Sequence, residues 1–137
     1  MGIELDDNPQ FKDYAHPEKF VSAAWLSARL GVPGLKVVES DEDAFLYDIG
    51  HIPGAVNVPW GRSVFPNARF RPVEDIRAIY EDFDRDAETV VYCQLGESSS
   101  HTWYVLKHVL GFTDVSLYDG SWAEWGNMVR VPVEKGE

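Results

Sequence analysis

The chain has 137 residues, 45% of them hydrophobic, which is the size of one ordinary domain with a core of its own. Its 23 acidic residues against 12 basic ones give a net charge of −11, which argues against nucleic acid and anionic membranes as partners. No apolar run approaches the ~18 residues of a membrane span, and the acidic first ten residues lack the pattern of a signal peptide. A single cysteine cannot form an internal disulfide. We expect a cytoplasmic protein, because a free thiol is most easily kept reduced in the cytosol.

The first half of the chain is predicted to contain an acidic lead-in, followed by a helix and two strands. Residues 1–15 show little periodicity and predict a flexible acidic lead-in to a single domain over residues 16–137. Ser22 is a suitable N-cap for a helix that stops near Gly31. Strands are predicted at residues 35–39 and 55–58, with one helical turn at 44–47 between them.

The second half begins with an irregular loop, residues 60–71, that holds three of the few cations: Arg62, Arg69 and Arg71. Pro72 suits the first turn of an amphipathic helix. Strands at 89–92 and 114–118 enclose another helix, and the spacing of Ser121 and Glu124 predicts a capping box for a last short helix. Strands and helices alternate throughout, which is typical of an α/β fold with a mostly parallel sheet.

The single cysteine, Cys93, follows a β-branched and aromatic strand and opens a polar loop that leads into a helix. Ligands of parallel sheets bind outside the carboxyl ends of the strands, and a helix N-terminus there favours anions and a thiolate. A buried structural cysteine is the alternative, since free cysteines are among the most buried residues. The position at the end of the strand favours a reactive thiol.

Three segments carry a resemblance to a known family. Residues 50–55 (GHIPGA), 93–100 (CQLGESSS) and 118–126 (YDGSWAEWG) resemble, in order and spacing, the signatures of the rhodanese domains of thiosulfate and 3-mercaptopyruvate sulfurtransferases. The likeness covers residues from about 21 to 133. It implies a three-layer α/β/α rhodanese-like fold with a five-stranded, mostly parallel sheet.

The resemblance differs along the chain. Residues 16–55 are more like the inactive first domain of the two-domain members, and residues 56–137 are more like their catalytic second domain. The chain thus looks like one compact domain that joins two halves. A surface that a sister domain covers in those members would then be bare, which favours a homodimer.

The implied activity is sulfur transfer through a persulfide on Cys93, from thiosulfate or a similar donor to a thiol or cyanide. The resemblance also implies the anion-binding residues of the loop: Gln94, Leu95, Gly96, Glu97, Ser98 and Ser99. No cofactor is implied. The scattered histidines and the single cysteine lack metal-ligand spacing, and His51, His101 and His108 are interpreted as structural.

The loop departs from thiosulfate-using members, which commonly carry arginines where Gln94 and Ser98 stand here. They also tend to have Asp-x-Arg at an earlier strand end, where this chain has Glu39-Ser40-Asp41. Fewer cations weaken the binding of a dianion, so a carrier or binding module that receives sulfur from another protein is the main alternative. A phosphatase of the same fold is disfavoured, because no arginine ends the loop.

Overall fold

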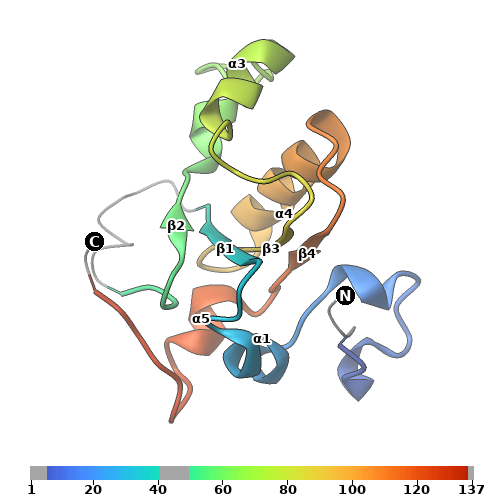
Figure 1. The fold of residues 1–137 in the computed structure, drawn as a ribbon, viewed down its shortest axis with the longest axis vertical. Coiled ribbons are helices and arrows are strands. Elements are labelled where there is room, and N and C mark those ends of the chain that lie inside the picture. The colour runs from blue at the N-terminus through green and yellow to red at the C-terminus, as the bar shows by residue number, and fades with distance from the viewer. Residues whose placement is uncertain (1–5, 41–49, 136–137) are drawn as a thin grey trace.

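In the computed structural model, which describes residues 6–40 and 50–135, the protein is a three-layer sandwich around a parallel sheet (Figure 1). The sheet has the order β2-β1-β3-β4. Its strands are β1 (Leu35–Glu39), β2 (Val56–Asn57), β3 (Glu88–Tyr92) and β4 (Val115–Leu117). All three pairings are parallel, as the alternation of elements predicts, so the carboxyl ends of β1, β3 and β4 share one edge.

Helices cover both faces of the sheet, and each face has its own apolar core. Helices α1 (Ala23–Arg29) and α5 (Ser121–Trp125) lie together on one face, as Figure 1 shows. The other face carries α3 (Val73–Ile79) and α4 (Glu97–Tyr104), which continues into the π-helical turn η4 (Val105–Val109). Alternate residues of the strands serve the two cores: Val37 and Val90 face the first, and Val38 and Val91 the second.

The described sheet has four strands, so the predicted fifth strand is absent from this part of the chain. Its place at the free edge of β4 is taken by one residue. Phe20 forms an isolated parallel bridge with Leu117, and the Val21 amide donates to the Leu117 carbonyl at 2.9 Å. The extended stretch is this short because the 3₁₀ turn η2 (Pro17–Lys19) precedes it and α1 follows at once.

Local capping explains why the chain turns into α1 where it does. Ser22 Oγ accepts a hydrogen bond from the Trp25 amide, which confirms the predicted N-cap. Asp6 holds the same serine, because its carboxylate accepts from the Ser22 amide and hydroxyl at 2.6 Å each. Phe11, in the 3₁₀ turn η1 (Pro9–Phe11), is also buried. The described part of the acidic lead-in is thus packed against the domain.

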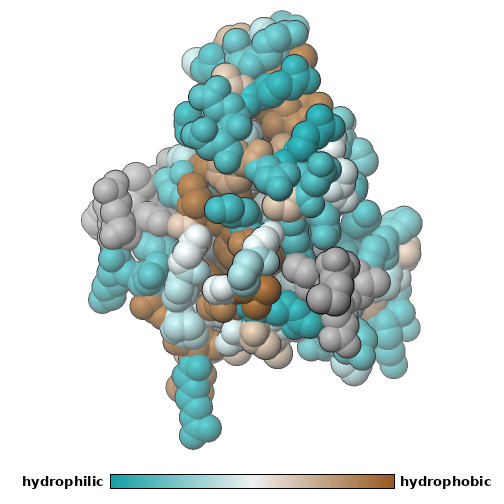
Figure 2. Space-filling model, in the orientation of Figure 1, coloured by the Kyte–Doolittle hydropathy of each residue, from teal (hydrophilic) through white to brown (hydrophobic). Residues whose placement is uncertain are grey.

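Two expectations fall outside the described residues, namely the helical turn at 44–47 and the position of Asp41. Among the residues that are described, no helix is long and apolar enough to cross a bilayer. Figure 2 shows hydrophilic side chains over most of the displayed face, with apolar ones gathered towards its middle.

Glu88, at the start of β3, makes stability depend on pH. Its Oε2 atom is buried with no hydrogen-bond partner among the described residues, and burial, with Asp114 nearby, raises its pKa from 4.5 to about 7. A raised pKa in the folded state means that stability is lost as pH rises from about 4.5 through 7. We expect Glu88→Gln to remove this loss and to stabilise the protein at pH 8 by about 1 kcal/mol, since the carboxyl is only partly buried.

Denaturant unfolding at pH 5 and pH 8 checks this expectation, with the exposed Glu81→Gln as the matched control. Equal pH dependence in the Glu88→Gln protein and the unmodified protein would show that the carboxyl is not perturbed by folding.

Candidate functional site

Cys93 lies where β3 ends, and the chain around it forms a tight loop. The Gly96 amide donates to Cys93 Sγ at 3.0 Å, and Sγ lies 3.5 Å from Ser99 Oγ. Ser99 Oγ in turn donates to the Gly96 carbonyl at 3.0 Å. The sulfur therefore accepts from one backbone N–H, and its own thiol hydrogen is donated to the Ser99 hydroxyl oxygen. The Gly96 N–H, just before α4, is the donor in this arrangement that can stabilise negative charge on sulfur.

Gly96 is required by this geometry. Its φ of 103° is strained for any other residue, and a Cβ there would lie 2.9 Å from Asp119 Oδ1 and 3.0 Å from the Asp119 carbonyl oxygen. The loop therefore closes over the sulfur only because this position lacks a side chain.

The thiol is less accessible than its position in the sequence predicts. Cys93 is only 1% exposed, because α4 begins directly above it and the β4–α5 connection packs beside it. A donor that contacts Sγ therefore requires the loop to yield. Burial agrees with the alternative of a structural cysteine, whereas both hydrogen-bond partners of Sγ are polar groups of the loop and the helix that follow.

The remaining loop residues have different positions. The Gln94 carbonyl accepts a hydrogen bond from the Ala123 amide at 2.9 Å. Leu95 is 70% exposed to solvent. Glu97 and Ser98 line a hollow beside the loop together with Trp60 and His101. The structure thus brings Gly96 and Ser99 to the sulfur and leaves Leu95 facing solvent.

Ser121, which its spacing to Glu124 predicts as a helix cap, holds the Cys93 backbone instead. Ser121 Oγ accepts from the Cys93 amide at 3.1 Å and donates to the Tyr118 carbonyl at 3.0 Å, and the Trp122 amide donates to the Cys93 carbonyl at 2.8 Å. Ser121 is fully buried with φ 55°, which is a strained conformation for serine.

The predicted capping box is therefore wrong. The Glu124 carboxylate, which would complete that box, accepts from Tyr118 Oη at 2.6 Å instead. The signal that could have identified Ser121 is the parallel sheet itself, because the loops after β3 and β4 leave neighbouring strands at the same edge.

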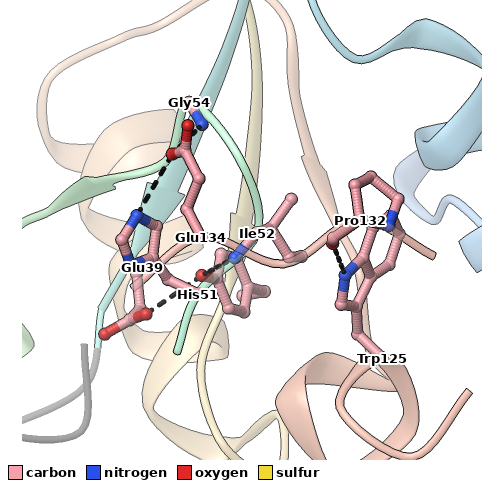
Figure 3. Close-up of polar contacts among 8 residues, drawn as sticks. Glu39, His51, Ile52, Gly54, Trp125, Pro132 and Glu134 are labelled. Carbon is pink, nitrogen blue, oxygen red and sulfur yellow. Dashed lines mark hydrogen bonds and ion pairs between the residues drawn. The ribbon is translucent and has the colours of Figure 1, made fainter. Parts of the chain in front are cut away.

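A buried polar network fixes the strand just before the cysteine (Figure 3). Tyr92 Oη donates to Glu39 Oε2 at 3.0 Å and accepts from the Ile52 amide at 3.1 Å, so the ends of β1 and β3 are joined to the 50–55 turn. His51 is buried, and its Nε2 lies 3.4 Å from Glu134 Oε2. This gives His51 a structural role, as expected.

Among the described residues, no arginine of the long loop is a hydrogen-bond partner of Cys93 Sγ. Arg71 Nε donates to the Val64 carbonyl at 3.1 Å, and its guanidinium lies 4.8 Å from the Phe65 ring centre. Arg62 and Arg71 line a hollow of about 690 Å³ formed by the loop itself. Among residues 6–40 and 50–135, no group of three or more His, Cys, Asp or Glu side chains is placed to hold a metal ion.

Comparison with known proteins agrees with this geometry. The model of the rhodanese-like domain matches residues 22–128. The putative thiosulfate sulfurtransferase SseA of Mycobacterium tuberculosis is 56% identical over an alignment that takes in the whole chain and 97% of the relative. This alignment spans 289 positions, whereas the chain has 137 residues, so the match passes over a long internal part of the relative.

Two further relatives match in part. The sulfur carrier protein TtuD of Thermus thermophilus is 53% identical over 90 residues, which is 64% of this chain and 32% of the relative. The 3-mercaptopyruvate sulfurtransferase structure from Escherichia coli aligns with a TM-score of 0.76 at 22% identity, over 86% of this chain and 50% of that one. The shared fold, the matched residues and the identity to SseA lead to one conclusion: the chain belongs to the rhodanese-like domain family.

Proposed function

We propose that this protein is a sulfurtransferase in which Cys93 carries sulfur as a persulfide. The observation that carries the proposal is the position of Sγ between the Gly96 amide and the Ser99 hydroxyl at the end of β3. The names of the relatives support the reaction class. The anion is proposed to bind to the backbone N–H groups of the loop residues Gln94 to Ser99.

The proposed reaction has two steps. In the first, the Cys93 thiolate attacks the outer sulfur of thiosulfate, a new S–S bond forms, the S–S bond of thiosulfate breaks, and sulfite leaves with the electron pair. In the second, a thiol or cyanide attacks the outer sulfur of the persulfide, and Cys93 departs as thiolate. The backbone N–H groups of the loop stabilise the negative charge that sulfur bears in both steps.

Thiosulfate is expected to be a poor donor. It carries two negative charges, and the chain offers Gln94 and Ser98 rather than arginines, with Glu97 adding a negative charge. The net charge of −11 also slows the encounter with any anion. We therefore expect a similar donor with less charge, such as 3-mercaptopyruvate, to load Cys93 at lower concentrations.

A carrier that receives sulfur from a partner protein is the second candidate. The Thermus thermophilus relative is named a sulfur carrier protein. Leu95, at the tip of the loop, is 70% exposed and could contact a partner protein, whereas Cys93 is 1% exposed. These exposures are consistent with a loop that opens when it binds a protein surface. We further propose a cytoplasmic location, which keeps the single thiol reduced, and a homodimer.

Steady-state turnover separates the two candidates. The protein is incubated with thiosulfate or 3-mercaptopyruvate and cyanide, and thiocyanate is measured. We expect turnover with at least one donor, saturating with 3-mercaptopyruvate first. Absence of thiocyanate with both donors, together with sulfur uptake only from a sulfur-loaded protein, would replace the enzyme by the carrier.

A further inference from the structure

A hollow of about 260 Å³ lies beside the cysteine loop and is not used by the chemistry described so far. It is lined by Trp60, Glu97, Ser98 and His101. Trp60 begins the 3₁₀ turn η3 (Trp60–Ser63), and the other three residues come from the first two turns of α4. Glu97 and Ser98 stand in the chain between Gly96 and Ser99, which both contact Cys93 Sγ. The hollow therefore lies beside the loop that encloses the sulfur. Cys93 itself is buried and does not line it, so an acceptor held there reaches Sγ only when the loop yields.

Aromatic rings form the wall of this hollow. The Trp60 and His101 ring centres are 5.1 Å apart and meet edge to face, and Phe70 packs on the same imidazole at 5.3 Å. Burial lowers the pKa of His101 below its usual 6.5, so the imidazole is neutral near pH 7. The formal charge of the lining residues is therefore the negative charge of Glu97.

None of the three arginines of the long loop is among the residues that line this hollow. Arg62 and Arg71 line the separate hollow of about 690 Å³, which has only Trp60 in common with this one. A carboxylate next to an indole favours a cation, because the carboxylate attracts it and the face of tryptophan is the strongest cation–π partner. The net charge of −11 draws cations towards the molecule and repels anions.

We propose that this hollow binds the sulfur acceptor and that the acceptor is a thiol that carries an ammonium group. The inference rests on the proposed persulfide function, and it adds the acceptor's chemical class and binding site. The acceptor gives its thiol proton to water and attacks as a thiolate. Its sulfur bonds to the outer sulfur of the persulfide, the Sγ–S bond breaks, and Cys93 leaves as a thiolate while the ammonium group lies between Glu97 and Trp60.

The test uses three small thiols of different charge on protein loaded with sulfur and freed of donor. Cysteamine carries a positive charge, 2-mercaptoethanol none and 3-mercaptopropionate a negative one. The loss of the persulfide is followed by mass, and the half-saturating thiol concentration is compared between Glu97→Gln and the unmodified protein. Glu97 is exposed, so the substitution is compatible with the fold.

We expect Glu97→Gln to raise the half-saturating concentration of cysteamine about fivefold, to leave that of 2-mercaptoethanol unchanged and to lower that of 3-mercaptopropionate. The control is Glu74→Gln, which removes an exposed carboxylate from the first turn of α3, outside the hollow, and is expected to change none of the three.

Two results would overturn the inference while the persulfide function stands. One is an equal shift for all three thiols with Glu97→Gln, and the other is the same charge-dependent shift with Glu74→Gln, which would assign the effect to the field of the whole molecule. If neither thiosulfate nor 3-mercaptopyruvate loads Cys93, the proposed function itself fails, and the inference falls with it.

Discussion

Replacing Cys93 by serine is expected to abolish sulfur transfer and to leave the protein folded. A serine hydroxyl is not ionised at neutral pH and forms no persulfide, so turnover should fall to the background rate with every donor. Serine fits the site, because its Oγ can accept from the Gly96 amide as Sγ does. Burying a hydroxyl in place of a thiol costs on the order of 1 kcal/mol.

The measurement is thiocyanate formation with each donor, together with circular dichroism and denaturant unfolding. Ser100→Ala is a matched control, because Ser100 lies in α4 after the cysteine loop, is exposed, and its hydroxyl donates only to the Glu97 carbonyl among the described residues. It should retain turnover close to that of the unmodified protein. Transfer by Cys93→Ser at the unmodified rate would show that the nucleophile lies elsewhere.

Adding arginines at positions 94 and 98 is expected to raise kcat/KM for thiosulfate by about 10- to 100-fold. Each exposed charge contact to an anion is worth on the order of 1 kcal/mol, and two contacts to a dianion act together. The gain should be smaller for 3-mercaptopyruvate, which has one negative charge. The variant is Gln94→Arg with Ser98→Arg, assayed with both donors.

The control for this variant places the same two charges far from the loop. Gln10→Arg with Ala78→Arg adds them at exposed positions in η1 and next to the end of α3. We expect little change in its preference between donors. If both double variants raise thiosulfate turnover equally, weak use of thiosulfate is explained by the net charge of the protein and not by the absence of arginines at positions 94 and 98.

Much of the fold could be predicted because local signals and tertiary packing agree. Strand β1 occurs at the predicted residues, and Ser22 caps α1 as its position before an apolar helical pattern indicates. The predicted number of strands, five, was wrong for the described residues. At the edge of β4 the chain pairs through the single residue Phe20, because helical segments lie close to it on both sides in the chain.

The site was harder to predict, because its contacts join distant parts of the chain. Cys93 and the loop after it could be found from the strand and the polar loop that follows. Ser121 was assigned to a helix cap because spacing alone cannot show that its hydroxyl reaches the Cys93 amide, 28 residues away. The pairing of Trp60 with His101 has no local signal either, since it depends on how η3 packs against α4.

The central claim is that sulfur is held on Cys93, and intact mass measurement tests it most directly. The protein is incubated with 3-mercaptopyruvate or thiosulfate and separated from the donor. Its intact mass is measured by mass spectrometry, and the modified peptide is then identified. We predict a gain of one sulfur atom on the peptide that contains Cys93, which is lost on addition of cyanide. An unchanged mass after exposure to both donors would contradict the account.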